Sequence, residues 1–264
     1  GMGAHAVGEK ASKKAAEIIP HVFAKHAEQE PALALYRAFQ EANRDIFQLG
    51  HQNLGFSGTG TTATALVLHP TGAWVGHVGD TRVYRIRNSK IEQLTFDHSL
   101  RWEVARRRGQ DPDQVTDVAS NAIVRSLGPE ETVQVDIEGP HPIQAGDIYV
   151  LCSDGLSGLV SDAEIGAIVS SLGVQEAVNF LVALANLRGG PDNITVIVVR
   201  VADYQSAASS SKKSSLLRRG AQAWMRLALH VKLGLGAILL GLACLAAVLL
   251  ALDMNAARTP LFFL

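Results

Sequence analysis

Two short acidic turns in the sequence each adjoin a strongly apolar segment. Asp154 follows the apolar run 148–151, and Asp192 precedes the apolar run 194–199. Glycines beside both aspartates allow a backbone or a ligand to come close. Carboxylates placed in this way at strand ends are a common way to build a metal site. If the two turns meet in space, the sequence predicts a metal-dependent enzyme; if they do not, they are ordinary polar turns of an α/β domain.

A third aspartate has a similar setting. Asp80 lies in the sequence Val-Gly-Asp-Thr-Arg at 78–82, where one predicted strand ends and the next begins. Carboxylate oxygens are hard ligands that suit magnesium or manganese better than zinc. A pair of such ions can bind hydroxide, lower the pKa of its parent water and direct it at phosphorus. By composition alone the ordinary turn is the better explanation, because Asp-Gly and Asp-Asn are common turn dipeptides.

Several other classes of chemistry are excluded by missing motifs. The sequence has no nucleotide P-loop, no Gly-x-Ser-x-Gly elbow and no His-Glu-x-x-His zinc motif, and no arginine stands six residues after Cys152. A net charge of −1 argues against a nucleic-acid-binding protein with a broad basic face. With only two cysteines in 264 residues, the chain has no disulfide framework and suits a reducing compartment. Carboxylate chemistry remains.

The elements that must position these residues follow from the hydrophobic pattern. Residues 9–51 have helical periodicity, and Pro31 suits the first turn of a second helix there. Short strands separated by tight turns then predict an antiparallel meander, and later strands flank a pair of helices. This order predicts a layered α+β sandwich. The predicted strands are 61–69, 73–78, 82–86, 91–94, 133–137, 147–152 and 193–201, with helices at 161–170 and 174–186.

The C-terminal part of the chain has a different character. Residues 204–232 form a Ser-rich linker and a basic juxtamembrane segment. Residues 233–252 are 20 uncharged, mostly apolar residues, the length of a transmembrane helix; a buried core helix is the alternative. Six Lys or Arg and no acids lie between 212 and 232, so the positive-inside rule predicts a cytoplasmic N-terminal domain. Residues 253–264 would then be a short external tail.

Seven short motifs occur in the order found in one enzyme family. The N-terminal part of the chain resembles the bacterial branch of the metal-dependent protein phosphatases (PPM, or protein phosphatase 2C-like) over about residues 1–201, so that the domain is expected to span residues 1–203. The motifs that carry the resemblance are Gly-Met-Gly-Ala-His at 1–5, Gly-Thr-Thr-Ala at 60–63, Val-Gly-Asp-Thr-Arg-Val-Tyr at 78–84, Asp-His-Ser-Leu at 97–100, Arg-Ser-Leu-Gly at 125–128, Ser-Asp-Gly-Leu at 153–156 and Gly-Pro-Asp-Asn at 190–193.

The resemblance implies a fold and a reaction. The fold would be a four-layer αββα sandwich of antiparallel sheets with a binuclear metal centre at one edge, followed here by a single transmembrane helix. The reaction would be hydrolysis of phosphoserine and phosphothreonine on proteins by a metal-activated water, with two Mg²⁺ or Mn²⁺ ions and a possible third. The partners would be phosphorylated proteins, the substrates of Ser/Thr kinases, at a bacterial cell membrane.

The resemblance also assigns roles to single residues. Asp154 and Asp192 match ligands of the binuclear site, and Asp80 matches the residue that, with Asp154, holds a third ion. Gly1 matches a glycine whose backbone carbonyl contacts one ion. His5 matches a histidine near the site and is the catalytic candidate. Residues 97–121 would form a flap for substrate discrimination, beginning with Asp97, His98 and Ser99, while Arg82 is expected to make structural ion pairs beside Asp80.

The sequence departs from the family pattern at its start. Ala4 replaces a second glycine, and the chain begins at the Gly of an Asp-Gly motif whose aspartate bridges both metals. We therefore expect an N-terminally truncated phosphatase that lacks its first strands and leaves neighbouring strand edges unpaired. The alternatives are a catalytically inactive PPM-like module that binds a partner at the inner membrane, and a fragment that does not fold. The presence of Asp80, Asp154 and Asp192 favours the enzyme.

Overall fold

A computed structural model describes residues 5–52, 56, 58–119, 122–202 and 261–263. The chain divides into two units, residues 1–204 with 261–264 and residues 205–260, and the described residues all belong to the first. The predicted linker and the predicted span at 233–252 lie outside the described residues. Among the residues that are described, no helix is both long and apolar enough to cross a membrane.

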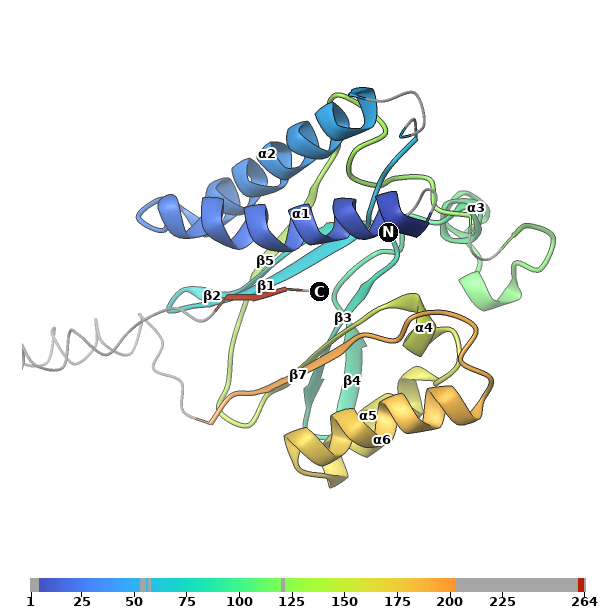
Figure 1. Ribbon diagram of the computed structural model, residues 1–264. Helices are drawn as coiled ribbons and strands as arrows, with labels where there is room; N and C mark the ends of the chain where they lie inside the picture. Colours follow the sequence, from blue (N-terminus) through green and yellow to red (C-terminus); the bar gives the residue numbers. More distant parts are fainter. Residues whose placement is uncertain (1–4, 53–55, 57, 120–121, 203–260, 264) are drawn as a thin grey trace, which may run out of the picture. The chain divides into compact units, whose positions relative to one another are not determined.

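Two four-stranded antiparallel sheets form the centre of the first unit (Figure 1). Their order follows the chain closely, because successive strands are joined by tight turns at 70–71 and 88–89. The first sheet has the order β5 (Asp136–His141), β2 (Gly72–Val78), β1 (Ala63–His69) and β8 (Leu261–Phe263). The second has the order β4 (Lys90–Gln93), β3 (Arg82–Arg87), β6 (Ile148–Cys152) and β7 (Val196–Arg200).

Helices cover the outer face of each sheet (Figure 1). The helices α1 (His5–Lys25) and α2 (Pro31–His51) pack on the first sheet, and α5 (Asp162–Ser171) and α6 (Val174–Leu187) pack on the second. As predicted, α2 begins at Pro31, where a missing N–H costs nothing. The short helices α3 (Leu100–Arg108), α4 (Asp154–Ser157) and a 3₁₀ turn (Pro112–Gln114) follow strand ends.

The alternation of side chains along the strands produces the layers. In β1, Ala65 and Val67 pack with the α1/α2 core, while Leu66 between them packs against the second sheet with Tyr149 and Leu151 of β6. Every residue of β2 and β6 is buried, because each strand is covered on both faces. The predicted four-layer αββα sandwich of antiparallel sheets is therefore confirmed.

Two strands differ from the predictions. The strand predicted at 133–137 is β5, which begins three residues later at Asp136, opposite His77, because its partner β2 ends at Val78. The carbonyl of Val133, before the strand, accepts a hydrogen bond from the Gln40 side chain of α2 at 2.6 Å. Leu261–Phe263, which the sequence did not predict as a strand, pairs with Val67–Ala65 of β1 as β8, whereas β7, one of the strands expected to lose a neighbour, is an edge strand of the second sheet. Residues 261–263 belong to the predicted tail at 253–264, of which residues 253–260 and 264 lie outside the described residues.

Candidate active site

The two acidic turns meet at one edge of the second sheet. Antiparallel pairing of β6 with β7 sets Cys152 opposite Val196, so the turn after β6 lies beside the turn before β7. The Ser153 side chain joins the turns: its hydroxyl donates to the Asn193 carbonyl at 3.1 Å and accepts from the Thr195 N–H at 3.0 Å. The two turns therefore meet in space, as the sequence required for a metal site.

Gly155 makes this approach possible. A Cβ on Gly155 would lie 2.4 Å from the carbonyl oxygen of Asn193 and 3.5 Å from that of Asp192. The first distance is far inside van der Waals contact, so a side chain at this position requires the turns to separate. Gly155, a glycine beside Asp154 that was expected to allow close approach, lets one acidic turn contact the other.

Asp80 reaches the same region from the first sheet. It lies between β2 and β3, on the connection from one sheet to the other, and is largely buried. The preceding residue, Gly79, makes two hydrogen bonds with His98. The Nδ1 of the His98 ring accepts the Gly79 N–H at 3.0 Å, and the backbone N–H of His98 donates to the Gly79 carbonyl at 2.7 Å. These two hydrogen bonds fix the backbone from which the Asp80 side chain extends.

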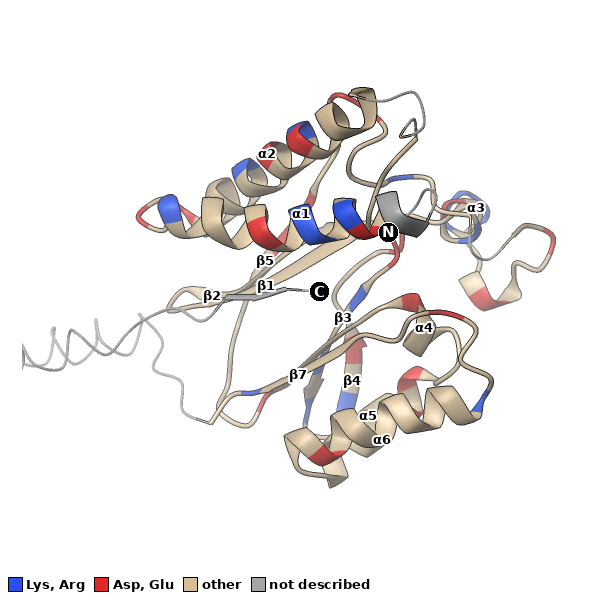
Figure 2. Ribbon diagram, viewed as in Figure 1, with Lys and Arg blue, Asp and Glu red and all other residues tan. Residues whose placement is uncertain are grey.

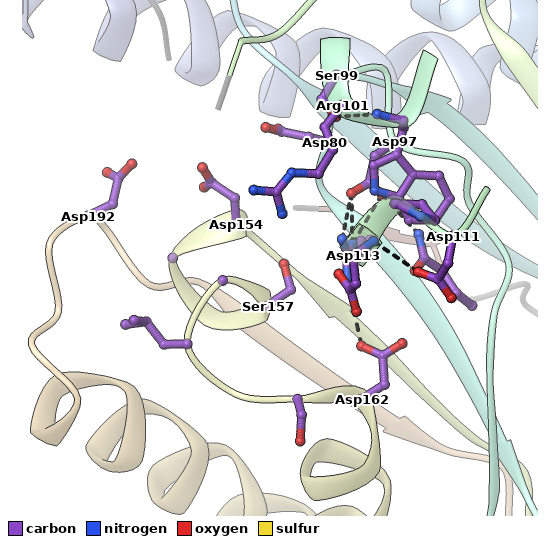
Figure 3. A pocket seen from close by; sticks show the side chains of 18 of the residues that line it. Asp80, Asp97, Ser99, Arg101, Asp111, Asp113, Asp154, Ser157, Asp162 and Asp192 are labelled. Atoms are coloured by element: carbon purple, nitrogen blue, oxygen red, sulfur yellow. Dashed lines mark hydrogen bonds and ion pairs between the residues drawn. The ribbon is translucent and has the colours of Figure 1, made fainter. Parts of the chain in front are cut away.

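Asp80, Asp154 and Asp192 line one cleft of about 1010 Å³ (Figure 3). Acidic residues mark this edge on α4 and on the loop from α6 to β7 (Figure 2). Burial, reinforced by the charges of Asp154 and then Asp97, raises the pKa of Asp80 to about 6. Burial and the charge of Asp192 raise the pKa of Asp154 above its usual range. The three carboxylates thus repel one another, and a bound cation would relieve that repulsion.

The donor set fits a hard divalent cation in its chemistry. All three side chains offer carboxylate oxygens, the ligands that magnesium and manganese prefer. Within the described residues no group of three or more His, Cys, Asp or Glu side chains is compact enough to form a metal site alone. The aspartates instead interact as two like-charged pairs, Asp80 with Asp154 and Asp154 with Asp192.

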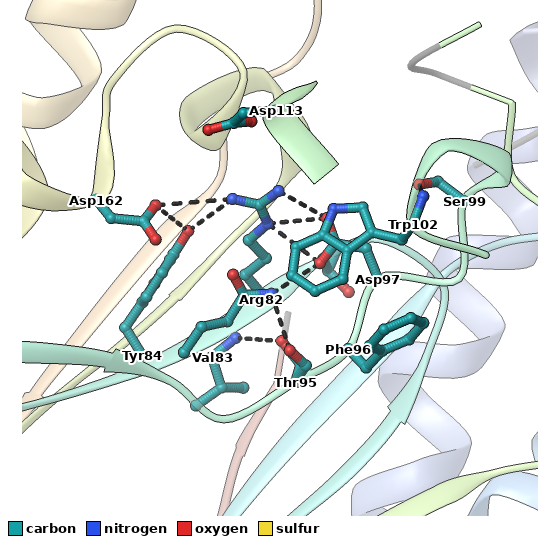
Figure 4. A network of polar contacts seen from close by, with 12 residues as sticks. Arg82, Val83, Tyr84, Thr95, Phe96, Asp97, Ser99, Trp102, Asp113 and Asp162 are labelled. Carbon is teal, nitrogen blue, oxygen red and sulfur yellow. Dashed lines mark hydrogen bonds and ion pairs between the residues drawn. The ribbon is translucent and has the colours of Figure 1, made fainter. Parts of the chain in front are cut away.

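Arg82 lines the cleft and is the centre of a network of polar contacts (Figure 4). Its guanidinium donates to Asp97 Oδ2 from Nε at 2.9 Å and from Nη2 at 2.7 Å, and from Nη1 to the Tyr84 hydroxyl at 3.0 Å. The Tyr84 hydroxyl in turn donates to Asp162 at 2.8 Å. This network confirms that Arg82 makes structural ion pairs, and it ties β3 to the start of α5.

The three flap residues singled out from the sequence hold the start of α3. The Asp97 carboxylate accepts from Arg82 and Gln93, and His98 is fully buried with its Nε2 at 2.9 Å from Asp136. The Ser99 hydroxyl caps α3 by accepting the Trp102 N–H at 3.4 Å. Asp97 and Ser99 line the cleft, and all three side chains are engaged in internal hydrogen bonds.

For the predicted site residues Gly1 and His5, no side-chain geometry is described. Gly1 lies outside the described residues, and His5 is the first residue of α1, where only its backbone is described. Five further lining residues were not named individually as site residues. Four of them lie in the predicted flap at 97–121, and Asp162 lies at the start of the predicted helix 161–170, so the sequence predicted their elements but not their place in the cleft. These residues are Arg101, Trp102, Asp111, Asp113 and Asp162.

The fold and cleft agree with a comparison against known families. A family model described as "Protein phosphatase 2C" matches residues 1–194. This match covers most of the chain, from the start of α1 through both acidic turns. The chain therefore belongs to the protein phosphatase 2C family.

Similar proteins support the same conclusion. The "Serine/threonine phosphatase stp" of Listeria innocua is 34% identical over 206 residues, covering 75% of this chain and 81% of the relative. The crystal structure of the Mycobacterium tuberculosis serine/threonine phosphatase PstP/Ppp superposes with a TM-score of 0.69 at 31% identity, covering 76% of this chain and 86% of that one. A structure of the PstP catalytic domain with two manganese ions has a TM-score of 0.64 at 32% identity, with coverage of 76% and 85%.

Proposed function

We propose that this protein hydrolyses phosphoserine and phosphothreonine in phosphorylated proteins with the help of bound Mg²⁺ or Mn²⁺. The observation that carries the proposal is the convergence of Asp80, Asp154 and Asp192 on one cleft of a phosphatase 2C fold. The names of the relatives support the reaction, and the manganese in the PstP structure supports the cofactor class. The substrates would be proteins phosphorylated by Ser/Thr kinases.

Each acidic residue has a proposed place in this reaction. Asp154 and Asp192 would hold two ions, with the Gly1 carbonyl as a further ligand, and Asp80 with Asp154 would hold a third. His5 is proposed to act beside them. When bound, the ions would supply Lewis acidity that activates water and neutralises charge on the phosphoryl group.

Other parts of the chain would orient the carboxylates and the substrate. Ser153 and Gly155 keep the two acidic turns in contact, and His98 fixes the backbone before Asp80. The Arg82 network keeps the Asp97 carboxylate occupied. Loops on the α3 side of the cleft are then free to discriminate between substrates, as loops placed on a rigid scaffold commonly do.

A second function is favoured by one observation. Because no compact group of metal-binding side chains occurs among the described residues, the cleft could also serve a non-catalytic module that binds a phosphorylated partner. The two functions differ in turnover: a binding module would release no phosphate, whereas the enzyme would release it continuously. The presence of three mutually repelling carboxylates favours the enzyme, since a phosphate dianion alone would be repelled by them.

Metal removal tests the proposed reaction. We expect the full chain to release phosphate from a phosphoserine peptide and from p-nitrophenyl phosphate in the presence of Mn²⁺. Dialysis against EDTA should abolish this activity, and Mn²⁺ or Mg²⁺ should restore it. Phosphate release that is unaffected by chelation would refute the metal-dependent reaction. Binding of the peptide without any release would support the non-catalytic module instead.

We also propose that residues 233–252 anchor the protein in a bacterial cell membrane, with the phosphatase domain in the cytoplasm. The supporting observations are the 20 uncharged residues and the six basic residues that precede them. A single span would carry the tail to the opposite side, so an anchored chain would not form the β8 pairing with β1. The anchored form and the paired form are therefore alternatives.

Deletion of residues 233–252 tests the anchor. The full chain should sediment with membranes and resist extraction by alkaline carbonate, because a transmembrane helix is held by its apolar length. The deletion variant should move to the soluble fraction while keeping its phosphatase activity. A full chain that is soluble, or a deletion variant that still resists extraction, would rule out this anchor.

A further inference from the structure

Among the described residues, the candidate active site has two basic lining side chains, and one of them has no ion-pair partner. Seven aspartates line the cleft, and only two lining residues are basic. Arg82 is neutralised by Asp97 and Asp162. Arg101 forms no ion pair within the part of the chain that the structure describes, and its buried Nε has no hydrogen-bond partner there. The seven aspartates are Asp80, Asp97, Asp111, Asp113, Asp154, Asp162 and Asp192.

The position of Arg101 is well defined by its surroundings. It is the second residue of α3, whose start is capped by Ser99 and held by a hydrogen bond from the Leu100 N–H to the Ala122 carbonyl at 2.8 Å. The next residue, Trp102, packs edge-on against Phe96 with ring centroids 5.0 Å apart. These contacts fix the first turn of α3. Figure 3 shows the Arg101 side chain extending into the cleft toward Asp154.

A guanidinium in this place suits a phosphoryl group. Arginine presents several N–H donors in a planar fork, which matches the oxygens of a phosphate better than a lysine does. A phosphate dianion that enters this cleft meets carboxylates on most sides, and Arg101 is the lining cation whose donors are not taken by any residue in the described part of the chain. The unpartnered Nε shows that no described residue holds this guanidinium through that atom, so a ligand that engages the guanidinium displaces no protein partner from it.

We propose that Arg101 binds the phosphoryl group of the phosphoserine or phosphothreonine substrate, and also the inorganic phosphate product. This inference rests on the proposed function and adds a substrate-binding residue to it. Arg101 would hold the phosphoryl group from the α3 side, opposite the acidic turns. It would therefore contribute to substrate affinity in the ground state and the transition state alike, which affects KM more than kcat.

Three variants of the full chain separate this role from a general charge effect. Arg101→Gln removes the cation and the fork, whereas Arg101→Lys keeps the charge without the fork. Arg107→Gln is the matched control, because Arg107 is exposed on the same helix and does not line the cleft. Circular dichroism confirms that each variant is folded. The measurements are KM and kcat for a phosphoserine peptide, the competitive Ki of inorganic phosphate, and the Mn²⁺ concentration for half-maximal activity.

We expect Arg101→Gln to raise both KM and the phosphate Ki by about tenfold or more, the effect of losing a charge-assisted hydrogen bond. Arg101→Lys should give intermediate values, and Arg107→Gln should stay within about twofold of the parent protein, as expected for a surface charge. Wild-type KM and Ki in Arg101→Gln would overturn the inference. A change only in the Mn²⁺ requirement would also overturn it, because Arg101 would then act as a counter-ion for the carboxylates.

Calorimetry with inorganic phosphate keeps this inference separate from the proposed reaction. If the parent protein shows no metal-dependent hydrolysis, the proposed function fails, but phosphate binding in the presence of Mn²⁺ still reports on Arg101. Binding that weakens in Arg101→Gln and not in Arg107→Gln supports the phosphate-binding role. Equal binding by the parent protein and both variants contradicts it.

Discussion

Replacing Asp154 by Asn should lower kcat for Mn²⁺-dependent hydrolysis of a phosphoserine peptide by on the order of 10³-fold, equivalent to about 4 kcal/mol of transition-state stabilisation. The amide keeps the size of the side chain but removes the charge that lies between Asp80 and Asp192. Since Asp154 is proposed to take part in holding every ion, its loss should affect the reaction more than the loss of either neighbour. Steady-state kinetics at saturating Mn²⁺ measures the effect.

A control variant in the same cleft distinguishes the loss of a negative charge from the loss of a metal ligand. Asp113 is exposed and lines the cleft from the 3₁₀ turn, and no metal role is proposed for it. Asp113→Asn makes the same change in charge and size, so it should alter kcat by less than about threefold, as expected for a solvent-screened charge. Equal losses in both variants would show that the cleft needs its net charge and not Asp154 as a ligand.

Gly155→Ala should lower kcat/KM by about 10²-fold while the protein stays folded. The added Cβ would lie 2.4 Å from the Asn193 carbonyl oxygen, so the turn that carries Asp192 must move away from the turn that carries Asp154. A displacement of about 1 Å in a reacting constellation is enough to cause a loss of this size. Activity assays, with a thermal unfolding curve to confirm the fold, measure the result.

Gly173→Ala is the matched control for this substitution. Gly173 precedes α6, and a Cβ there would meet only the Glu176 side chain at 3.5 Å, an ordinary contact. Its activity should equal that of the parent protein. Full activity in Gly155→Ala would mean that contact between the two acidic turns is not required for the reaction.

Local chemistry in the sequence predicted much of this arrangement. Apolar runs beside Asp154 and Asp192 identified β6 and β7, and antiparallel pairing of these strands was sufficient to bring their adjoining turns together. Pro31 predicted the start of α2 because the missing N–H of proline is tolerated in the first turn of a helix. Such features depend on neighbouring residues, so they can be read without knowing the tertiary structure.

Other features depend on contacts between distant residues and could not be predicted in this way. The start of β5 depends on where its partner β2 ends, and the segment before it is held to α2 by the hydrogen bond from Gln40 to the Val133 carbonyl, a contact across 93 positions. His98 lies in the predicted flap, and its buried ring accepts the Gly79 N–H, a contact across 19 positions that the sequence did not indicate. Arg101 lies within the predicted flap at 97–121, but only the packing of α3 beside the cleft gives its side chain a direction.

Binding of Mn²⁺ to the full chain, titrated by isothermal calorimetry, tests the proposed metal centre most directly. We expect the parent protein to bind two Mn²⁺ ions, and the double variant Asp154→Asn with Asp192→Asn to lose this binding while it stays folded. Loss of binding is expected because both acidic turns would then lack the negative charge that attracts a divalent cation. Unchanged Mn²⁺ binding in the double variant would contradict the assignment of the two turns as a metal site.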